Sequence, residues 1–154
     1  MPTIDMQKQE QRKTLCIRTQ TSVRELADTI HAGYTQLGTY MGAQGYIPKE
    51  APYVAYFNMD EDNLQIEMGF PVDREITEQG EIRMGSIPSG WVVQTIHQGP
   101  YEAMGPLYEQ LFQWIKDKGL TQTGTYYEYY LNSPEEANPE ELMTKLAVPV
   151  DRAD

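Results

Sequence analysis

The chain has 154 residues, a formal net charge of −11 and a pI near 4.5, and 40% of its residues are hydrophobic. This length allows one buried core, while the acidity and the absence of any basic run argue against direct nucleic-acid binding. A single cysteine excludes an intramolecular disulfide, and no apolar run reaches the roughly 18 residues of a membrane span, so we expect a cytoplasmic protein without membrane contact.

The chain reads as one domain over residues 12–151, preceded by a polar, flexible leader at 1–11. Within the domain we distinguish module one (about 12–73), a connector rich in glycine and proline (74–90) and module two (about 91–151).

Module one begins with a strand at residues 15–19, followed by a helix whose apolar side chains recur at helical spacing. Ser22 and Glu25 form a capping-box pattern at the start of this helix, and the Gly42 and Gly45 pair marks its end. Two further strands and one short strand in the connector are expected at residues 53–57, 64–70 and 82–87.

Module two repeats this plan, with a helix that follows Gly99-Pro100 and ends at Gly119. Its strands are expected at residues 91–97, 126–131 and 143–148, and one short helical turn is expected at residues 138–142. The sequence therefore predicts an α+β fold of tandem, pseudo-symmetric β-α-β-β modules. We expect a mainly antiparallel, curved sheet with two helices on one face and a ligand groove on the other.

The two modules are related by a shift of 74 residues, under which seven of the 25 positions from 34 to 58 are identical. Unrelated sequences would share about one or two such positions. The identical pairs are Tyr34 and Tyr108, Gln36 and Gln110, Leu37 and Leu111, Gly45 and Gly119, Tyr53 and Tyr127, Tyr56 and Tyr130, and Asn58 and Asn132. At one strand position the chemistry changes, because Val54 of module one becomes Glu128 of module two.

Side chains alternate along a strand, so Tyr126, Glu128 and Tyr130 share one face. The other set, with Tyr127 and Tyr129, is more uniformly apolar, and we expect it to pack against the helices and to leave Glu128 on the open face. A carboxylate among aromatic rings suits a lipophilic cation, and it could also take part in proton transfer. The alternative interpretation is an ordinary solvated glutamate, or a face covered by the connector.

The remaining candidate residues favour structural roles. Cys16 lies in an apolar strand without a basic neighbour, so we expect a buried and unreactive thiol. His97 is expected to be structural, and His31, beside the apolar stripe of the first helix, to be a surface or boundary residue. The sequence contains no metal-ligand spacing and no cofactor-binding motif.

Three motifs of module two resemble the GyrI-like small-molecule-binding family, the effector-binding domain of AraC-type and MerR-type multidrug regulators. They are His97-x-Gly99-Pro100-Tyr101, Tyr127-Glu128-x-Tyr130-Leu131-Asn132-Ser133-Pro134, and Pro139-Glu140-Glu141-Leu142-x-Thr144. The resemblance implies a groove between two β-α-β-β modules, with Glu128 as the glutamate that meets cationic aromatic drugs. The ligand-binding candidates beside Glu128 are Tyr126, Tyr130, Tyr56, Val54, Trp91, Tyr46 and Met68.

About a dozen polar residues precede the first expected strand, so the chain resembles a stand-alone member without a DNA-binding domain. We rank binding or sequestration of a lipophilic, cationic aromatic compound first. Hydrolysis of cyclopropane-bearing alkylating compounds ranks second, with Glu128 as a water-directing base and Tyr130 or Tyr126 polarising the leaving oxygen. Inhibition of DNA gyrase through protein contact ranks third.

Overall fold

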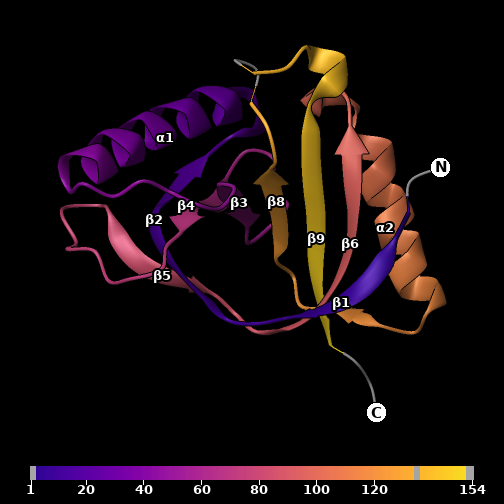
Figure 1. Cartoon of the computed structure of the whole chain (residues 1–154). Coiled ribbons are helices and arrows are strands. Elements are labelled where there is room, and N and C mark those ends of the chain that lie inside the picture. Colours follow the sequence, from indigo (N-terminus) through magenta and orange to yellow (C-terminus); the bar gives the residue numbers. More distant parts are fainter. Residues whose placement is uncertain (1–2, 134–135, 152–154) are drawn as a thin grey trace. The chain divides into compact units, whose positions relative to one another are not determined.

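The computed structural model describes residues 3–133 and 136–151, and the chain divides into two compact units. The first unit is Gln11–Pro88, and the second unit combines the residues before Gln11 with those after Pro88. Each unit carries one long helix on an antiparallel sheet, which confirms the α+β class (Figure 1). Neither helix has the combination of length and apolar character that a membrane crossing requires within the described residues.

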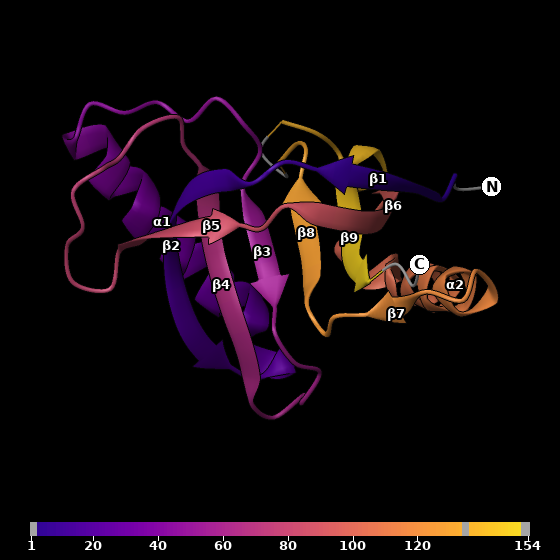
Figure 2. The same ribbon diagram turned by 90° about the horizontal axis from the view of Figure 1, so that it is seen from below.

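The first unit has four strands and a long helix that follows a single 3-10 turn (Figure 2). These elements are β2 (Arg12–Thr21), η1 (Val23–Glu25), α1 (Leu26–Ala43), β3 (Tyr53–Tyr56), β4 (Leu64–Pro71) and β5 (Arg83–Ile87). β4 pairs with β3 on one side and β2 on the other, and β2 also pairs with β5, so the strand order is β3-β4-β2-β5.

The second unit has the same strand order with different sequence elements. They are β1 (Asp5–Gln9), β6 (Gly90–Gln98), η2 (Tyr101–Ala103), α2 (Gly105–Asp117), β7 (Thr121–Gln122), β8 (Tyr126–Tyr130), η3 (Pro139–Glu141) and β9 (Met143–Asp151). β9 pairs with β8 and β6, β6 pairs with β1, and the short β7 adds to β9. The order β8-β9-β6-β1 therefore matches β3-β4-β2-β5, and the tandem β-α-β-β plan is confirmed as β2-α1-β3-β4 and β6-α2-β8-β9.

The expected flexible leader is wrong for residues 5–9, because this segment forms β1 and pairs along β6. It takes in the second unit the edge position that β5 takes in the first. Its polar sequence hides this role, since an edge strand needs a ladder of backbone hydrogen bonds more than an apolar face. Residues 1–2 of the expected leader lie outside the described residues.

The helices begin and end at capping residues that are recognisable in the sequence. The Ser22 hydroxyl accepts a hydrogen bond from the backbone N–H of Glu25, at the 3-10 turn that leads into α1. Gly45 and Gly119 follow the two long helices with the same φ of 70°, and the next residue of each donates to a carbonyl in the last turn. This left-handed ending is one that glycine adopts without strain, which explains why both copies keep it.

The cores lie between each helix and its sheet. In the first unit Met68 of β4 packs so closely under α1 that a side chain at Gly33 would overlap its sulfur. In the second unit α2 buries Leu107, Leu111 and Ile115 against β6 and β9. Leu37 and Leu111, which the repeat aligns, are both completely buried.

Asn58 and Asn132 show that the repeat is structural as well as sequential. The Asn58 side chain accepts from Gln65 N at 3.0 Å and donates to the Asn63 carbonyl at 3.0 Å. The Asn132 side chain accepts from Met143 N at 2.8 Å and donates to the Glu141 carbonyl at 3.0 Å. Each asparagine therefore closes the connection between the last two strands of its module in the same way.

Candidate functional site

Glu128 lies on the face of β8 that is turned toward α2. Its register partner on β9 is Leu146, which belongs to the core that α2 buries. Only 6% of Glu128 is exposed. The expectation that Glu128 occupies the face away from the helices is therefore wrong, and it is the set of Tyr127 and Tyr129 that lies on the other face.

Both carboxylate oxygens of Glu128 accept hydrogen bonds from tyrosine hydroxyls. Tyr108 of α2 donates to Oε2 at 2.6 Å, and Tyr130 of β8 donates to Oε1 at 2.7 Å. Hydrogen bonds to an ionised acceptor are shorter and stronger than neutral ones. They also fix the orientation of the carboxylate, so its position is set by two different elements, α2 and β8.

Aromatic rings surround this carboxylate. Tyr101 meets Tyr130 edge to face with ring centroids 5.7 Å apart, and Phe112 lies between Tyr108 and Tyr126 at centroid distances of 6.0 and 5.5 Å. Tyr101, Tyr108, Phe112, Tyr126 and Tyr130 are all half-buried rather than enclosed. The site thus combines a buried negative charge with ring surface that reaches solvent.

Tyr101 senses the charge of Glu128. Burial raises the pKa of the Tyr101 phenol, and the negative charge of Glu128 raises it further. Both causes act in the same direction because each disfavours the phenolate. The Glu128 carboxylate is therefore felt electrostatically at a ring that is itself half-exposed.

Three of the expected ligand-binding residues share this face with Glu128. Tyr126 and Tyr130 lie on the same strand at alternate positions, and Tyr126 packs against the core under α2. Trp91, the second residue of β6, pairs with Val150 and packs half-buried against the same core.

The other expected residues belong to the first unit. Val54 and Met68 are register partners on β3 and β4, are almost completely buried and face α1. Tyr56 is half-buried at the end of β3 on the same face. Tyr46 lies after α1, where its hydroxyl accepts from Asp73 N at 3.1 Å and its ring carries the Arg74 guanidinium at 5.1 Å.

Tyr108 contacts the Glu128 carboxylate but was not among the expected site residues, since its place in the apolar stripe of the helix indicated only core packing. Its counterpart Tyr34 donates from α1 to the backbone carbonyl of Tyr53. A half-buried hydroxyl needs an acceptor, and the Val54-to-Glu128 change supplies one on a side chain. The signal was available as the combination of a repeated helix tyrosine and a one-sided carboxylate.

Cys16 is the buried thiol that the sequence predicts, and the two histidines lie on β6 and α1. Cys16 is buried on β2, and burial together with the charge of Glu67 raises the pKa of its thiol to about 12. A ring nitrogen of His97 lies 2.9 Å from the Pro100 carbonyl, and His31 is exposed on α1. Residues 3–133 and 136–151 contain no group of three or more His, Cys, Asp or Glu arranged to hold a metal ion.

Solved structures with this fold include EcmrR in complex with DNA, with a TM-score of 0.87 and 22% identity. This match covers 99% of the present chain but only 58% of the EcmrR chain. The separate C-terminal domain of EcmrR matches with a TM-score of 0.78 and 21% identity, covering 99% of both chains.

Two other relatives differ in what their structures are said to do or to bind. A hydrolase from Listeria innocua encoded by lin2189 matches with a TM-score of 0.70 and 15% identity, over 96% of this chain and 91% of that one. SAV2435, solved with bound tetraphenylphosphonium, matches with a TM-score of 0.66 and 11% identity, over 97% of this chain and 94% of that one. At sequence identities this low, the structural matches establish a shared fold and nothing more.

A search among curated proteins found no significant match. The family model of the GyrI-like small molecule binding domain, in contrast, matches residues 2–151. Because this match spans nearly the whole sequence and the fold agrees with it, the chain belongs to the GyrI-like small-molecule-binding domain family.

Proposed function

We propose that the second unit binds a lipophilic organic cation, with Glu128 as its charge partner and the surrounding rings as its contact surface. The observation that carries this proposal is the buried Glu128 carboxylate, held by Tyr108 and Tyr130 at 2.6 and 2.7 Å among half-exposed aromatic side chains. Aromatic faces attract cations through their quadrupoles, and this attraction grows when water is displaced.

The electrostatics of the site support a cationic ligand over a neutral one. A buried charge is poorly screened, so it acts on an approaching cation from several ångströms away. The effect of Glu128 on the pKa of Tyr101 supports such a reach within the protein itself. The ligand therefore need not break either tyrosine hydrogen bond to be stabilised by the carboxylate.

The relative SAV2435 supports the same ligand chemistry, because its structure holds tetraphenylphosphonium, a cation enclosed in aromatic rings. Family membership supports the broader role of small-molecule binding. The present chain adds a carboxylate and at least five aromatic side chains on one face of one unit.

The test is a calorimetric titration of wild type and Glu128→Gln with tetraphenylphosphonium and with the neutral triphenylphosphine oxide. Glutamine keeps the shape and one acceptor oxygen but removes the charge, so we expect the cation to bind roughly 10- to 100-fold more weakly and the neutral compound to be little affected. Equal losses for both compounds would show that Glu128 shapes the site without selecting charge.

Hydrolysis is a second candidate, favoured by the adjacency of Glu128 and Tyr130 and by the similarity of the fold to the Listeria innocua hydrolase. Glu128 would take a proton from a water molecule whose oxygen bonds to a cyclopropane carbon. The strained carbon–carbon bond would break, and its electron pair would pass to a carbonyl oxygen conjugated with the ring, which Tyr130 would polarise. Incubation with a cyclopropane-bearing alkylator, followed by mass spectrometry, distinguishes the two functions. Product that accumulates beyond one equivalent of protein would show that the protein is an enzyme, whereas recovery of the intact compound would argue against hydrolysis.

A further inference from the structure

A second buried carboxylate lies in the first unit, on the sheet face opposite α1. Arg18 of β2 and Glu67 of β4 are register partners, and Ala55 of β3 is the partner of Glu67 on its other side. The neighbouring positions on β4, including Met68, face α1. Glu67 therefore occupies a different face and a different unit from Glu128.

Glu67 is 3% exposed, and each of its oxygens accepts from a different donor. Tyr53 donates its hydroxyl to Oε2 at 2.7 Å, and Arg18 donates Nε–H to Oε1 at 2.7 Å. With this proton given to Glu67, the Tyr53 oxygen accepts from the Thr14 hydroxyl, 2.9 Å away, which ties the carboxylate into a buried polar network.

The exposed Arg18 side chain contacts both a buried carboxylate and an aromatic ring. Its side chain is 73% exposed, whereas the Glu67 side chain is only 4% exposed. The guanidinium also lies over the Phe57 ring, with 5.0 Å between Cζ and the ring centroid. A planar cation is thus held from the solvent side by a carboxylate and an aromatic face, the same chemistry that would bind an external organic cation.

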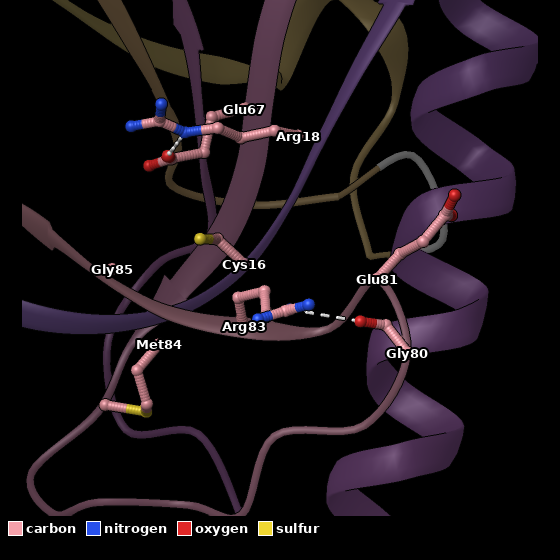
Figure 3. A pocket seen from close by; sticks show the side chains of 8 residues that line it. All are labelled: Cys16, Arg18, Glu67, Gly80, Glu81, Arg83, Met84 and Gly85. Carbon is pink, nitrogen blue, oxygen red and sulfur yellow. Dashed lines mark hydrogen bonds and ion pairs between the residues drawn. The ribbon is translucent and has the colours of Figure 1, made fainter.

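A cavity of about 340 Å³ adjoins this ion pair, a volume in the range of small-molecule sites. Cys16, Arg18 and Glu67 line one part of it, and the 80–85 segment lines the rest. Figure 3 shows the Glu67 carboxylate beside the Arg18 guanidinium, and the Glu81 side chain directed away from Cys16. Gly85 keeps the space open, because a side chain there would come within 2.9 Å of the Cys16 sulfur.

We propose that this cavity is a second cation site, which takes a small planar cation of the guanidinium or amidinium class against Glu67 in place of the Arg18 side chain. Arg18 is the built-in competitor that holds the site closed to other ligands. The proposal concerns a different carboxylate from Glu128 and stands independently of the function proposed for the second unit.

The replacement of the Arg18 side chain by a ligand is selective for cations because Glu67 is buried. Removing the partner of a buried charge is strongly unfavourable, so Arg18 can leave only when another cation takes its place. The exposed position of Arg18 lets its side chain move into solvent without rearrangement of β2. A competitor that occupies the site reduces the apparent affinity for the ligand to the intrinsic affinity multiplied by the fraction of time that the site is open.

The test uses methylguanidinium chloride as the probe, with sodium chloride and tetramethylammonium chloride at equal ionic strength. Binding to wild type, Arg18→Ala, Glu67→Gln and the double variant is followed by amide chemical shifts of residues 83–85. We expect Arg18→Ala to bind methylguanidinium at least about tenfold more tightly than wild type, and both variants that carry Glu67→Gln to lose binding. Glu61→Gln, which removes an exposed charge from the same unit, serves as the matched control.

Binding that survives in the double variant would overturn the proposal, as would a response of Arg18→Ala to tetramethylammonium equal to that for methylguanidinium. If Arg18→Ala does not fold, wild type and Glu67→Gln still decide the question. Weak binding by wild type that disappears in Glu67→Gln supports the site, and equal shifts in the two proteins refute it.

Discussion

Among the residues that the structure describes, each unit buries one carboxylate, and the comparison shows how a repeated framework acquires different chemistry. Glu67 and Glu128 both accept from a tyrosine hydroxyl, but Glu67 also binds the Arg18 guanidinium, whereas Glu128 accepts from a second tyrosine. They occupy unequal places in the repeat, since Glu128 corresponds to Val54 and faces the helix, while Glu67 faces away from it. Shared architecture therefore does not imply a shared site, and each unit must be judged by its own side chains.

The largest expected effect tests whether the two cores are equivalent. Leu37 and Leu111 are both completely buried at aligned positions of the two helices. Leu37→Ala and Leu111→Ala should each lower the free energy of unfolding by about 2 to 5 kcal/mol, through lost burial and the cavity left behind. Urea denaturation of both variants measures this, and a large difference between them would show that the units are not energetically matched.

A smaller difference in the free energy of unfolding is expected between variants of the two units at Tyr34 and Tyr108. Tyr34 donates to a backbone carbonyl and Tyr108 to a carboxylate. We expect Tyr34→Phe to cost about 0.5 to 1.5 kcal/mol and Tyr108→Phe about 1.5 to 3 kcal/mol, because hydrogen bonds to charged groups are worth more. Equal losses in thermal or urea unfolding would argue that Glu128 gains nothing from its helix partner.

Asn58 and Asn132 provide the opposite case, in which the repeat preserves both residue and role. Each side chain makes two hydrogen bonds to the backbone around the last inter-strand connection of its module. Asn58→Ala and Asn132→Ala should each cost about 1 to 2 kcal/mol, with values that agree within error. Unequal costs would mean that matching geometry conceals different local stability.

The smallest expected effect reads the charge of Glu128 directly. Glu128→Gln should lower the pKa of Tyr101 toward its ordinary value but not fully to it, because burial remains the larger cause of the raised pKa. Since folding raises this pKa, the contribution of Tyr101 to stability is complete below its unfolded pKa and declines as the pH rises through the folded one. A ¹³C-tyrosine NMR titration measures the change, and Glu67→Gln should leave the Tyr101 titration unaltered.

Most elements of the fold follow from the sequence, because turn residues and apolar periodicity are local signals. The strands expected at 53–57, 64–70, 82–87 and 126–131 coincide closely with β3, β4, β5 and β8. β1 could not be found in this way, since its polar residues gain their structure from pairing with β6, which lies far along the chain. β7 has only two residues and carries no pattern of its own.

The site could be predicted in part. The change from Val54 to Glu128 pointed to a carboxylate that two tyrosine hydroxyls contact in the structure, and its role in binding stays a prediction. Alternation separates the two faces of β8 but does not say which one meets the helix, because both faces are rich in tyrosine. The more apolar character of the set with Tyr127 and Tyr129 favoured placing it against the helix. In the structure the Glu128 carboxylate lies on the helix side instead, where the Tyr108 hydroxyl donates a hydrogen bond to it.

The placement of β1 has a consequence for synthesis on the ribosome. The first unit is continuous in sequence from Gln11 to Pro88, so its sheet can be completed once that stretch has emerged. The second unit begins with β1 but closes only through β6 and β9, the last of which ends at Asp151. Domains generally fold as units in the order of their emergence, so β1 leaves the ribosome well before β6, the strand with which it pairs. During that interval the nascent chain exposes an unpaired strand, whose polar character protects it from aggregation.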